Sequence, residues 1–243
     1  MEEKKIFLLD FDGVLFDSTL EAYYVTLETT IPGSLNKNSI VNENRYNRFL
    51  DLRPFLVSAW QFYWIADYMK CPYDEDRFEH YSKDLINIQN DKTREFESNF
   101  LIQRLNLAKK NYYDLQINLP YKFWNLIYPI MRLFPERFKI LSAKDYVSIG
   151  RTLDDHDFDH KWIDIIGKKE FKENNENKRD VFIKHIKKNE NESFILFDDS
   201  DVHMKEFLDE PSVECFRVLW GYVPKDIKKN NMLEAFKKIT HNL

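Results

Sequence analysis

The segment Ile6–Val14 constrains the fold of this chain more than any other stretch. It reads Ile-Phe-Leu-Leu-Asp-Phe-Asp-Gly-Val, so an apolar run leads into two carboxylates, Asp10 and Asp12, and then a glycine. A continuous apolar run is typical of a strand buried on both faces, as strands of a parallel sheet usually are. Buried carboxylates are costly to ionise unless a partner compensates them, and a divalent cation is the obvious candidate. The alternative is a hydrophobic strand that ends in an ordinary polar turn.

Further apolar segments follow in the second half of the chain and alternate with helical patterns. The patterns predict strands and helices at these approximate positions: strands at 138–141, 162–167, 193–197 and 213–220, and helices at 121–133, 145–153, 178–188 and 225–238. Alternation of this kind predicts crossover connections and a parallel sheet.

The region from residue 18 to residue 120 has a different character. A helix is predicted from Ser18 to Thr30, and helical spacing continues over 43–70, 75–90 and 91–113, with no convincing buried strand between about 36 and 119. We therefore divide the chain into a sheet domain, residues 1–17 and 121–243, and an inserted all-helical domain, residues 18–120.

Charge and cysteine content narrow the class of protein. The formal net charge is −5, which disfavours a nucleic-acid backbone as the main partner. The two cysteines, Cys71 and Cys215, form no Cys-x-x-Cys pair, and this suits a reducing cytosol. No secretory signal is evident at the N-terminus, and the apolar stretch 55–69 is shorter than a membrane span. We expect a cytoplasmic protein without a membrane partner.

Polar side chains follow three of the predicted strands. The first strand ends in Asp10 and Asp12, the second in Ser142, and the fourth in Asp198 and Asp199. Because parallel strands present their carboxyl ends at one edge of the sheet, we expect these side chains to converge there. This convergence is the main argument from the residues alone for a functional site.

The same segments resemble, in order and spacing, the four motifs of the haloacid dehalogenase superfamily, a large group of aspartate-nucleophile phosphohydrolases. Asp10–Ser18 resembles the first motif very closely, Leu141-Ser142 the second, Lys178 before a helix the third, and Asp198-Asp199 the acidic fourth. The resemblance covers the sheet domain and implies an α/β fold with a Rossmann-like parallel sheet in three layers, α/β/α. It also implies that the helical block is a mobile cap domain inserted between motifs one and two.

The resemblance assigns roles to the acidic residues. It implies that Asp10 is the nucleophile that forms an aspartyl-phosphate, and that Asp12 is the general acid and then the general base. It implies that Mg²⁺ is bound by Asp10, the backbone carbonyl of Asp12 and Asp199. Asp198 is expected to be an outer partner of the metal, or a ligand if Asp199 is not.

Ser142 and Lys178 are implied to hold the phosphate oxygens and to offset charge in the transition state. Each has an alternative. Ser142 can instead cap the helix that starts at Asp145, and Lys144 is the main rival of Lys178 for the cationic role.

One position departs from the family's pattern. Many relatives carry a further acid four positions after the metal-binding aspartate, and that position is His203 here. An imidazole adds no negative charge, which puts metal affinity in doubt, and Asp201 is the candidate substitute.

The helical block is rich in aromatic residues. Its aromatic residues between positions 23 and 68 include Tyr23, Tyr24, Tyr46, Phe49, Phe55, Trp60, Phe62, Tyr63, Trp64 and Tyr68. They are interpreted either as a lining for a flat leaving group such as a nucleotide, or as a helical core or homodimer interface. The second interpretation is favoured.

Together these features predict a Mg²⁺-dependent phosphomonoester hydrolase of small phosphorylated metabolites. Three alternatives remain: a phosphotransferase or phosphomutase that uses the same intermediate, a non-catalytic regulatory relative, and a phosphatase that processes nucleic-acid ends. The acidic charge weighs against the last of these.

Overall fold

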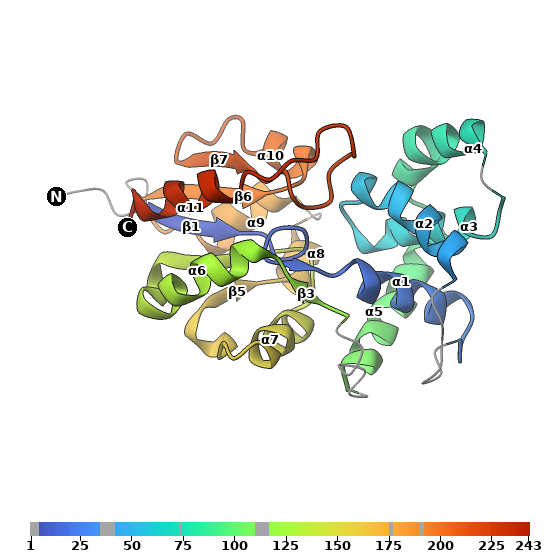
Figure 1. The fold of residues 1–243 in the computed structure, drawn as a ribbon, viewed down its shortest axis with the longest axis horizontal. Helices are drawn as coiled ribbons and strands as arrows, with labels where there is room; N and C mark the ends of the chain where they lie inside the picture. Colours follow the sequence, from blue (N-terminus) through green and yellow to red (C-terminus); the bar gives the residue numbers. More distant parts are fainter. Residues whose placement is uncertain (1–4, 35–41, 73, 110–116, 175–176, 190–191) are drawn as a thin grey trace. The chain divides into compact units, whose positions relative to one another are not determined.

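The computed structural model describes residues 5–34, 42–72, 74–109, 117–174, 177–189 and 192–243 (Figure 1). Contacts within the chain divide it into two compact units. Met1–Asp17 and Leu119–Leu243 form one of them, which we call the sheet unit, and Ser18–Asn118 forms the other, the helical unit.

A five-stranded parallel sheet forms the centre of the sheet unit (Figure 1). The order across the sheet is β5-β4-β1-β6-β7, and the strands are β1 (Lys5–Leu9), β4 (Phe138–Leu141), β5 (Asp164–Ile166), β6 (Ser193–Asp198) and β7 (Val213–Arg217). In the central strand, Leu9 is level with Ile140 on one side and Phe197 on the other. The carboxyl end of β1 therefore lies at the point where the strand order reverses, the usual ligand position in such sheets.

Successive side chains of each strand point to opposite faces of the sheet and build two separate cores. Phe7 and Leu9 enter the first core, and Leu8 enters the second. The first core is completed by α6 (Lys122–Leu133), α7 (Tyr146–Asp155) and α11 (Met232–Thr240). The second is completed by α8 (Lys168–Glu173), α9 (Lys178–His185) and Phe207, which directly follows α10 (Asp201–Glu206). These helices on both faces confirm the expected three-layer α/β/α fold.

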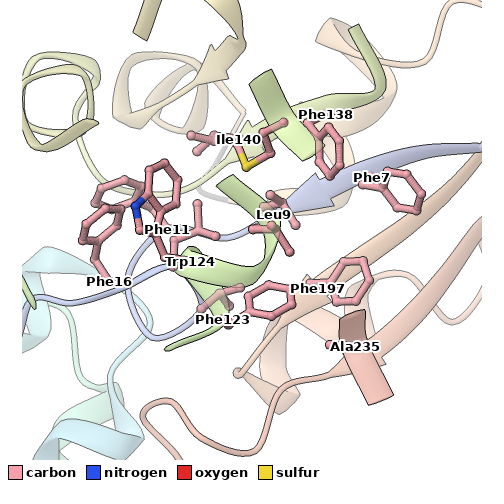
Figure 2. Close-up of a cluster of buried hydrophobic side chains, with 14 of the residues drawn as sticks. Phe7, Leu9, Phe11, Phe16, Phe123, Trp124, Phe138, Ile140, Phe197 and Ala235 are labelled. Carbon is pink, nitrogen blue, oxygen red and sulfur yellow. The ribbon is translucent and has the colours of Figure 1, made fainter. Parts of the chain in front are cut away.

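Aromatic rings dominate the first core (Figure 2). Phe7 packs on Phe138 with ring centroids 5.0 Å apart, and Phe11 stacks on Phe16 at 4.9 Å. Phe11 lies in the loop that also carries Asp10 and Asp12, and its side chain is fully buried. The hydrophobic core therefore holds this acidic loop in place.

The helical unit has a core of its own. Its α-helices are α1 (Thr19–Thr30), α2 (Glu43–Leu52), α3 (Phe62–Tyr68), α4 (Glu75–Glu79) and α5 (Asp91–Lys109). Phe62 stacks on Phe100 with centroids 4.9 Å apart, and Tyr23 meets Phe49 edge-on at 5.5 Å. Many of the aromatic residues thus serve as the internal core of this unit, in agreement with the structural interpretation of the aromatic pattern.

The chain passes between the two units twice, and the segments at which it does so form a short antiparallel pair of strands. β2 (Phe16–Asp17) pairs with β3 (Leu119–Pro120), so that Asp17 lies opposite Leu119. The chain leaves the sheet unit after β2 and returns at β3. The sequence analysis missed this pair, since two-residue strands are too short to show a periodic pattern.

Two expected elements near the C-terminus are shorter than the sequence suggested. The strand expected over 213–220 ends at Arg217, and the helix expected over 225–238 spans Met232–Thr240 instead. Asn231 explains the later start of the helix, because its side chain accepts from the Leu219 N–H and donates to the Arg217 carbonyl. The helix expected over 91–113 is α5, which ends at Lys109, and residues 110–113 lie outside the described residues.

Within the part of the chain that the structure describes, none of the helices combines the length and the apolar character needed to cross a bilayer.

Arg137 supports a prediction about the stability of the sheet unit. Its buried guanidinium donates to the carbonyls of Lys5, Asn242 and Leu243, each at 2.8 Å. Because hydrogen bonds from charged donors are stronger than neutral ones, we expect Arg137→Met to lower the free energy of unfolding by about 2–3 kcal/mol. Arg132→Met, at an exposed arginine, is expected to cost less than about 1 kcal/mol in the same urea titration. Equal losses in the two variants would contradict the proposed role of Arg137.

Candidate active site

Asp10 follows the central strand directly and is nearly buried, with 7% of its surface exposed. Its backbone N–H donates to the Phe197 carbonyl at 3.0 Å and so extends the pairing of β1 with β6. Its side-chain Oδ1 accepts from the Phe11 N–H at 2.8 Å. The carboxylate therefore has a fixed orientation at the carboxyl edge of the sheet.

Lys178 brings Asp10 and Asp198 together. Its Nζ lies 2.5 Å from Asp198 Oδ2 and 3.5 Å from Asp10 Oδ2, and its side chain is fully buried. Lys178 is the first residue of α9, and its backbone N–H donates to Glu206 Oε2 at 2.6 Å. Two aspartates at the ends of β1 and β6 thus share one ammonium group from the start of a helix.

Burial and ion pairing shift the pKa values of the groups in this cluster in opposite directions. Burial raises the pKa of Asp10 above its ordinary value, and the nearby Lys178 only partly offsets the effect. Burial also opposes ionisation of Asp198, but Lys178 and His203 outweigh it and hold the pKa of Asp198 below its usual range. For Lys178, burial lowers the pKa, yet the two carboxylates more than compensate and raise it. The ammonium form of Lys178 and the carboxylate form of Asp198 therefore stabilise each other.

The structure brings His203, not Asp201, to this cluster. His203 is buried, and its Nδ1 lies 3.1 Å from Asp198 Oδ2. Asp201 is exposed and pairs with Arg217 at 2.7 Å. Ser200 caps α10, and its hydroxyl accepts from the backbone N–H of His203, which holds the backbone of His203 at the start of this helix.

Asp199 packs against two glycines. A Cβ atom at Gly13 would lie 2.2 Å from Asp199 Oδ2, and one at Gly221 would lie 2.5 Å from the same atom. Gly13 also has φ of +87°, a conformation that side-chain-bearing residues rarely adopt. The Tyr222 N–H donates to Asp199 Oδ2, and the Tyr222 hydroxyl donates to Asp17 at 3.3 Å. The loop after β7 therefore fixes Asp199 against the loop after β1.

Ser142 and Lys144 follow β4 and face the acidic loop. Ser142 is buried, and its side chain hydrogen-bonds Asp10, which favours the ionised form of that carboxyl and so acts to lower its pKa. Lys144 Nζ donates to Asp12 Oδ1 at 3.1 Å. Lys178 and Lys144, the two candidates for the cationic role at the phosphate, thus lie in different places, Lys178 beside Asp10 and Lys144 beside Asp12.

The acidic cluster is compatible with a metal ion. One potential ligand atom each from Asp10, Asp198 and His203 lies within 4.8 Å of the others, and all three residues are buried. Carboxylate oxygens are the ligands that hard divalent cations prefer. All the site residues predicted from the sequence lie in the sheet unit, at the ends of its strands or, for Lys178, at the start of a helix.

Sequence reasoning missed three residues that shape the site. Glu206 holds the backbone of Lys178, and Gly221 and Tyr222 hold Asp199. Glu206 lies in a polar helix with no distinguishing pattern. The sequence Trp-Gly-Tyr at 220–222 was a visible signal, because a glycine directly after an apolar strand marks a possible close backbone approach.

Comparisons with solved structures agree with this fold along the entire chain. A predicted phosphatase from Clostridium acetobutylicum is 16% identical, with a TM-score of 0.60 and coverage of 99% of this chain and 100% of that one. A haloacid dehalogenase-like hydrolase from Streptococcus pneumoniae is 15% identical, with a TM-score of 0.55 and coverage of 97% and 98%. A predicted phosphoglycolate phosphatase from Haemophilus somnus is 11% identical, with a TM-score of 0.54 and coverage of 98% and 99%. No protein-family profile and no curated protein matches the chain.

The glycine contacts at Asp199 lead to a stability prediction. In Gly221→Ala, the new Cβ would also lie 2.2 Å from the Gly13 carbonyl oxygen, so the backbone or Asp199 must shift. We expect a loss of about 2–4 kcal/mol in the free energy of unfolding. Gly33→Ala is the control, because Gly33 has a φ of +81° but no atom within 4 Å of the new Cβ, and strain alone costs about 1 kcal/mol. A Gly221→Ala variant no less stable than Gly33→Ala would contradict the described contact.

Proposed function

Since the chain has the fold of haloacid dehalogenase-like hydrolases, we propose that it is a Mg²⁺-dependent phosphomonoester hydrolase that acts on small phosphorylated metabolites. One observation carries the proposal. Asp10 is a buried, oriented carboxylate at the carboxyl end of the central strand, with Asp12 two residues further on and Lys178 beside it. An oriented carboxylate with a second acid and a cation nearby supports nucleophilic attack on phosphorus.

The reaction has two steps in this proposal. A carboxylate oxygen of Asp10 attacks phosphorus, an aspartyl-phosphate bond forms, and the bond from phosphorus to the ester oxygen breaks. Asp12 donates a proton to the departing oxygen. In the second step Asp12 takes a proton from a water molecule, whose oxygen attacks phosphorus and releases phosphate and free Asp10.

Ser142 and Lys178 are proposed to hold the phosphate oxygens. Both contact Asp10, so a phosphate bound to Asp10 comes near their polar groups. Lys178 also forms an ion pair with Asp198. We propose that its charge both keeps Asp10 in place and offsets negative charge that develops on the phosphate.

Two of the three clustered residues, Asp10 and Asp198, offer the carboxylate oxygens that Mg²⁺ prefers. We propose that Asp10, the Asp12 carbonyl and Asp199 hold the ion, with Asp198 as an outer partner. Asp198 fits that lesser role because its oxygens already contact Lys178, His203 and the Ser200 N–H. When bound, the cation lessens the repulsion between an anionic carboxylate and an anionic phosphate ester.

The remaining assignments rest on the resemblance and the order of the chain. We propose that the helical unit acts as the cap that selects the substrate, since it is inserted between Asp12 and Ser142. A small metabolite is favoured over nucleic acid because the net charge is −5. The cytoplasmic location and a homodimer stay predictions.

The nucleophile gives the most direct test. We expect phosphate release from some member of a panel of nucleotides, sugar phosphates, phosphoglycolate and p-nitrophenyl phosphate, dependent on Mg²⁺ and lost in EDTA. Asp10→Asn is expected to lower kcat by at least about a thousandfold. Asp164→Asn is the matched control, since Asp164 is an exposed aspartate on β5, and its activity is expected to be that of the wild type.

The outcomes separate the competing functions. Release that survives in Asp10→Asn would refute Asp10 as the nucleophile. Phosphate transferred to an added hydroxyl compound, in place of free phosphate, would indicate a phosphotransferase or phosphomutase. Absence of any turnover in folded wild-type protein would favour a non-catalytic relative.

His203 gives a separate prediction about the metal. It stands where many relatives have an acid, so His203→Asp adds a negative charge beside Asp198. Because metal affinity rises with the charge of the surrounding ligands, we expect the Kd for Mg²⁺ to fall at least about fivefold, measured by isothermal titration calorimetry. His203→Asn changes the shape without adding charge and is expected to leave the Kd within about twofold. A similar tightening in both variants would show that charge is not the cause.

A further inference from the structure

Lys144 is a buried lysine that the proposed reaction does not use. We propose that Lys144 is a positioning residue that holds the carboxyl group of Asp12 in the place from which its protonated form donates a proton to the departing oxygen. This inference rests on the proposed function and adds to it a residue that acts through Asp12.

The contact between the two side chains is short and largely sheltered from water. Lys144 Nζ lies 3.1 Å from Asp12 Oδ1, and the exposed fractions of the two side chains are 1% and 19%. A buried ammonium loses its hydration, so it depends on partners such as this carboxylate. Asp12, by contrast, is only partly buried.

The backbone of Lys144 is anchored. Its carbonyl accepts from the Lys168 N–H at 3.0 Å, and its N–H donates to Ser142 Oγ at 3.4 Å. Gly167 lies so close that a Cβ there would be 3.0 Å from the Lys144 carbonyl oxygen. The next residue, Asp145, caps α7 by accepting from the Ser148 N–H. Lys144 therefore extends from a fixed point of the loop after β4.

The far end of the Lys144 side chain is fixed as well. Its Nζ lies 5.5 Å from the centre of the Phe11 ring, which is itself fully buried in the first core. Phe11 stands between Asp10 and Asp12 in the chain, so one lysine touches the ring and the carboxylate of the same loop. These contacts limit the rotamers open to Asp12.

Proton transfer from Asp12 depends on a restricted set of rotamers of its side chain. A general acid must lie within about 2.6–3.2 Å of the atom that receives the proton, or reach that atom through one water molecule. A carboxylate that changes rotamer spends less time at that distance. By holding Oδ1, Lys144 keeps the carboxyl group of Asp12 at one place on the rim of the site.

The contact itself is tested without activity. We expect Lys144→Met to lower the thermal midpoint of the metal-free protein by several degrees. In the Asp12→Asn background, where the carboxylate partner is already absent, the decrease is expected to be smaller. Lys139→Met is the matched control, because Lys139 lies on β4 and pairs with Asp164. Its shift is expected to be the same in the wild-type and Asp12→Asn backgrounds. Equal shifts for Lys144→Met in both backgrounds would overturn the proposal.

The role in proton transfer is tested with two leaving groups. The quantity is kcat/KM, which covers the steps up to formation of the aspartyl-phosphate. We expect Lys144→Met to lower it by about a hundredfold for an alkyl phosphate, whose departing oxygen needs a proton. For p-nitrophenyl phosphate, whose leaving group departs as the anion, the loss is expected to be less than about tenfold. A merely structural role would lower both values by the same factor.

Two further measurements complete the design. In the Asp12→Asn background, Lys144→Met is expected to change kcat/KM for p-nitrophenyl phosphate by less than about twofold, because the residue that it positions is gone. If Lys144→Met does not fold, Lys144→Gln takes its place and is expected to show the same preference for the better leaving group.

The failure of this inference differs from the failure of the proposed function. A wild type that releases no phosphate from either ester overturns the proposed function, and the inference with it. A wild type that is active, with equal losses for the two esters in Lys144→Met or with a full loss in the Asp12→Asn background, overturns the inference alone.

Discussion

The buried ammonium group of Lys178 is the interaction on which the rest of the site depends. It lies between Asp10 and Asp198, two carboxylates that end neighbouring strands and that burial alone would drive toward the neutral form. Removing one partner of a buried ion pair typically costs about 3–5 kcal/mol, because the other charge is left without compensation. The β1–β6 pairing, the start of α9 and the placement of Glu206 all serve to keep this group of charges together.

The loops around these charges are anchored in two ways. Phe11 is buried in the aromatic core and fixes the acidic loop from one side. Gly13, in the same loop, has no side chain and therefore lets Asp199 pack closely against it. The loop after β7 adds the Tyr222 N–H and Gly221, where a Cβ atom would come too close to Asp199 and the Gly13 carbonyl oxygen. Rigid loops of this kind reduce the entropy that must be lost when a reactive geometry forms.

Sequence reasoning predicted the elements that local pattern determines. The strand at 138–141 was placed correctly, because a continuous apolar run between polar residues is a strong signal for a buried strand. The joint position of Asp10, Ser142 and Asp198 followed from parallel topology alone. The contacts of Lys144 and Glu206 did not, because each depends on which loop a distant segment packs against. The helix expected from residue 225 failed for a similar reason, since the long-range bonds of Asn231 are invisible in the local sequence.

The pairing of β2 with β3 has a consequence for how such a chain can be assembled. Asp17 and Leu119 lie opposite each other in an antiparallel pair. The two ends of the inserted helical unit are therefore held side by side by this pair. In topological terms the helical unit is the loop of a β-hairpin that has grown into a domain. A tight turn of a few residues can bridge two such strands. The register of β2 with β3 therefore sets where the inserted segment begins and ends, but not how long it is.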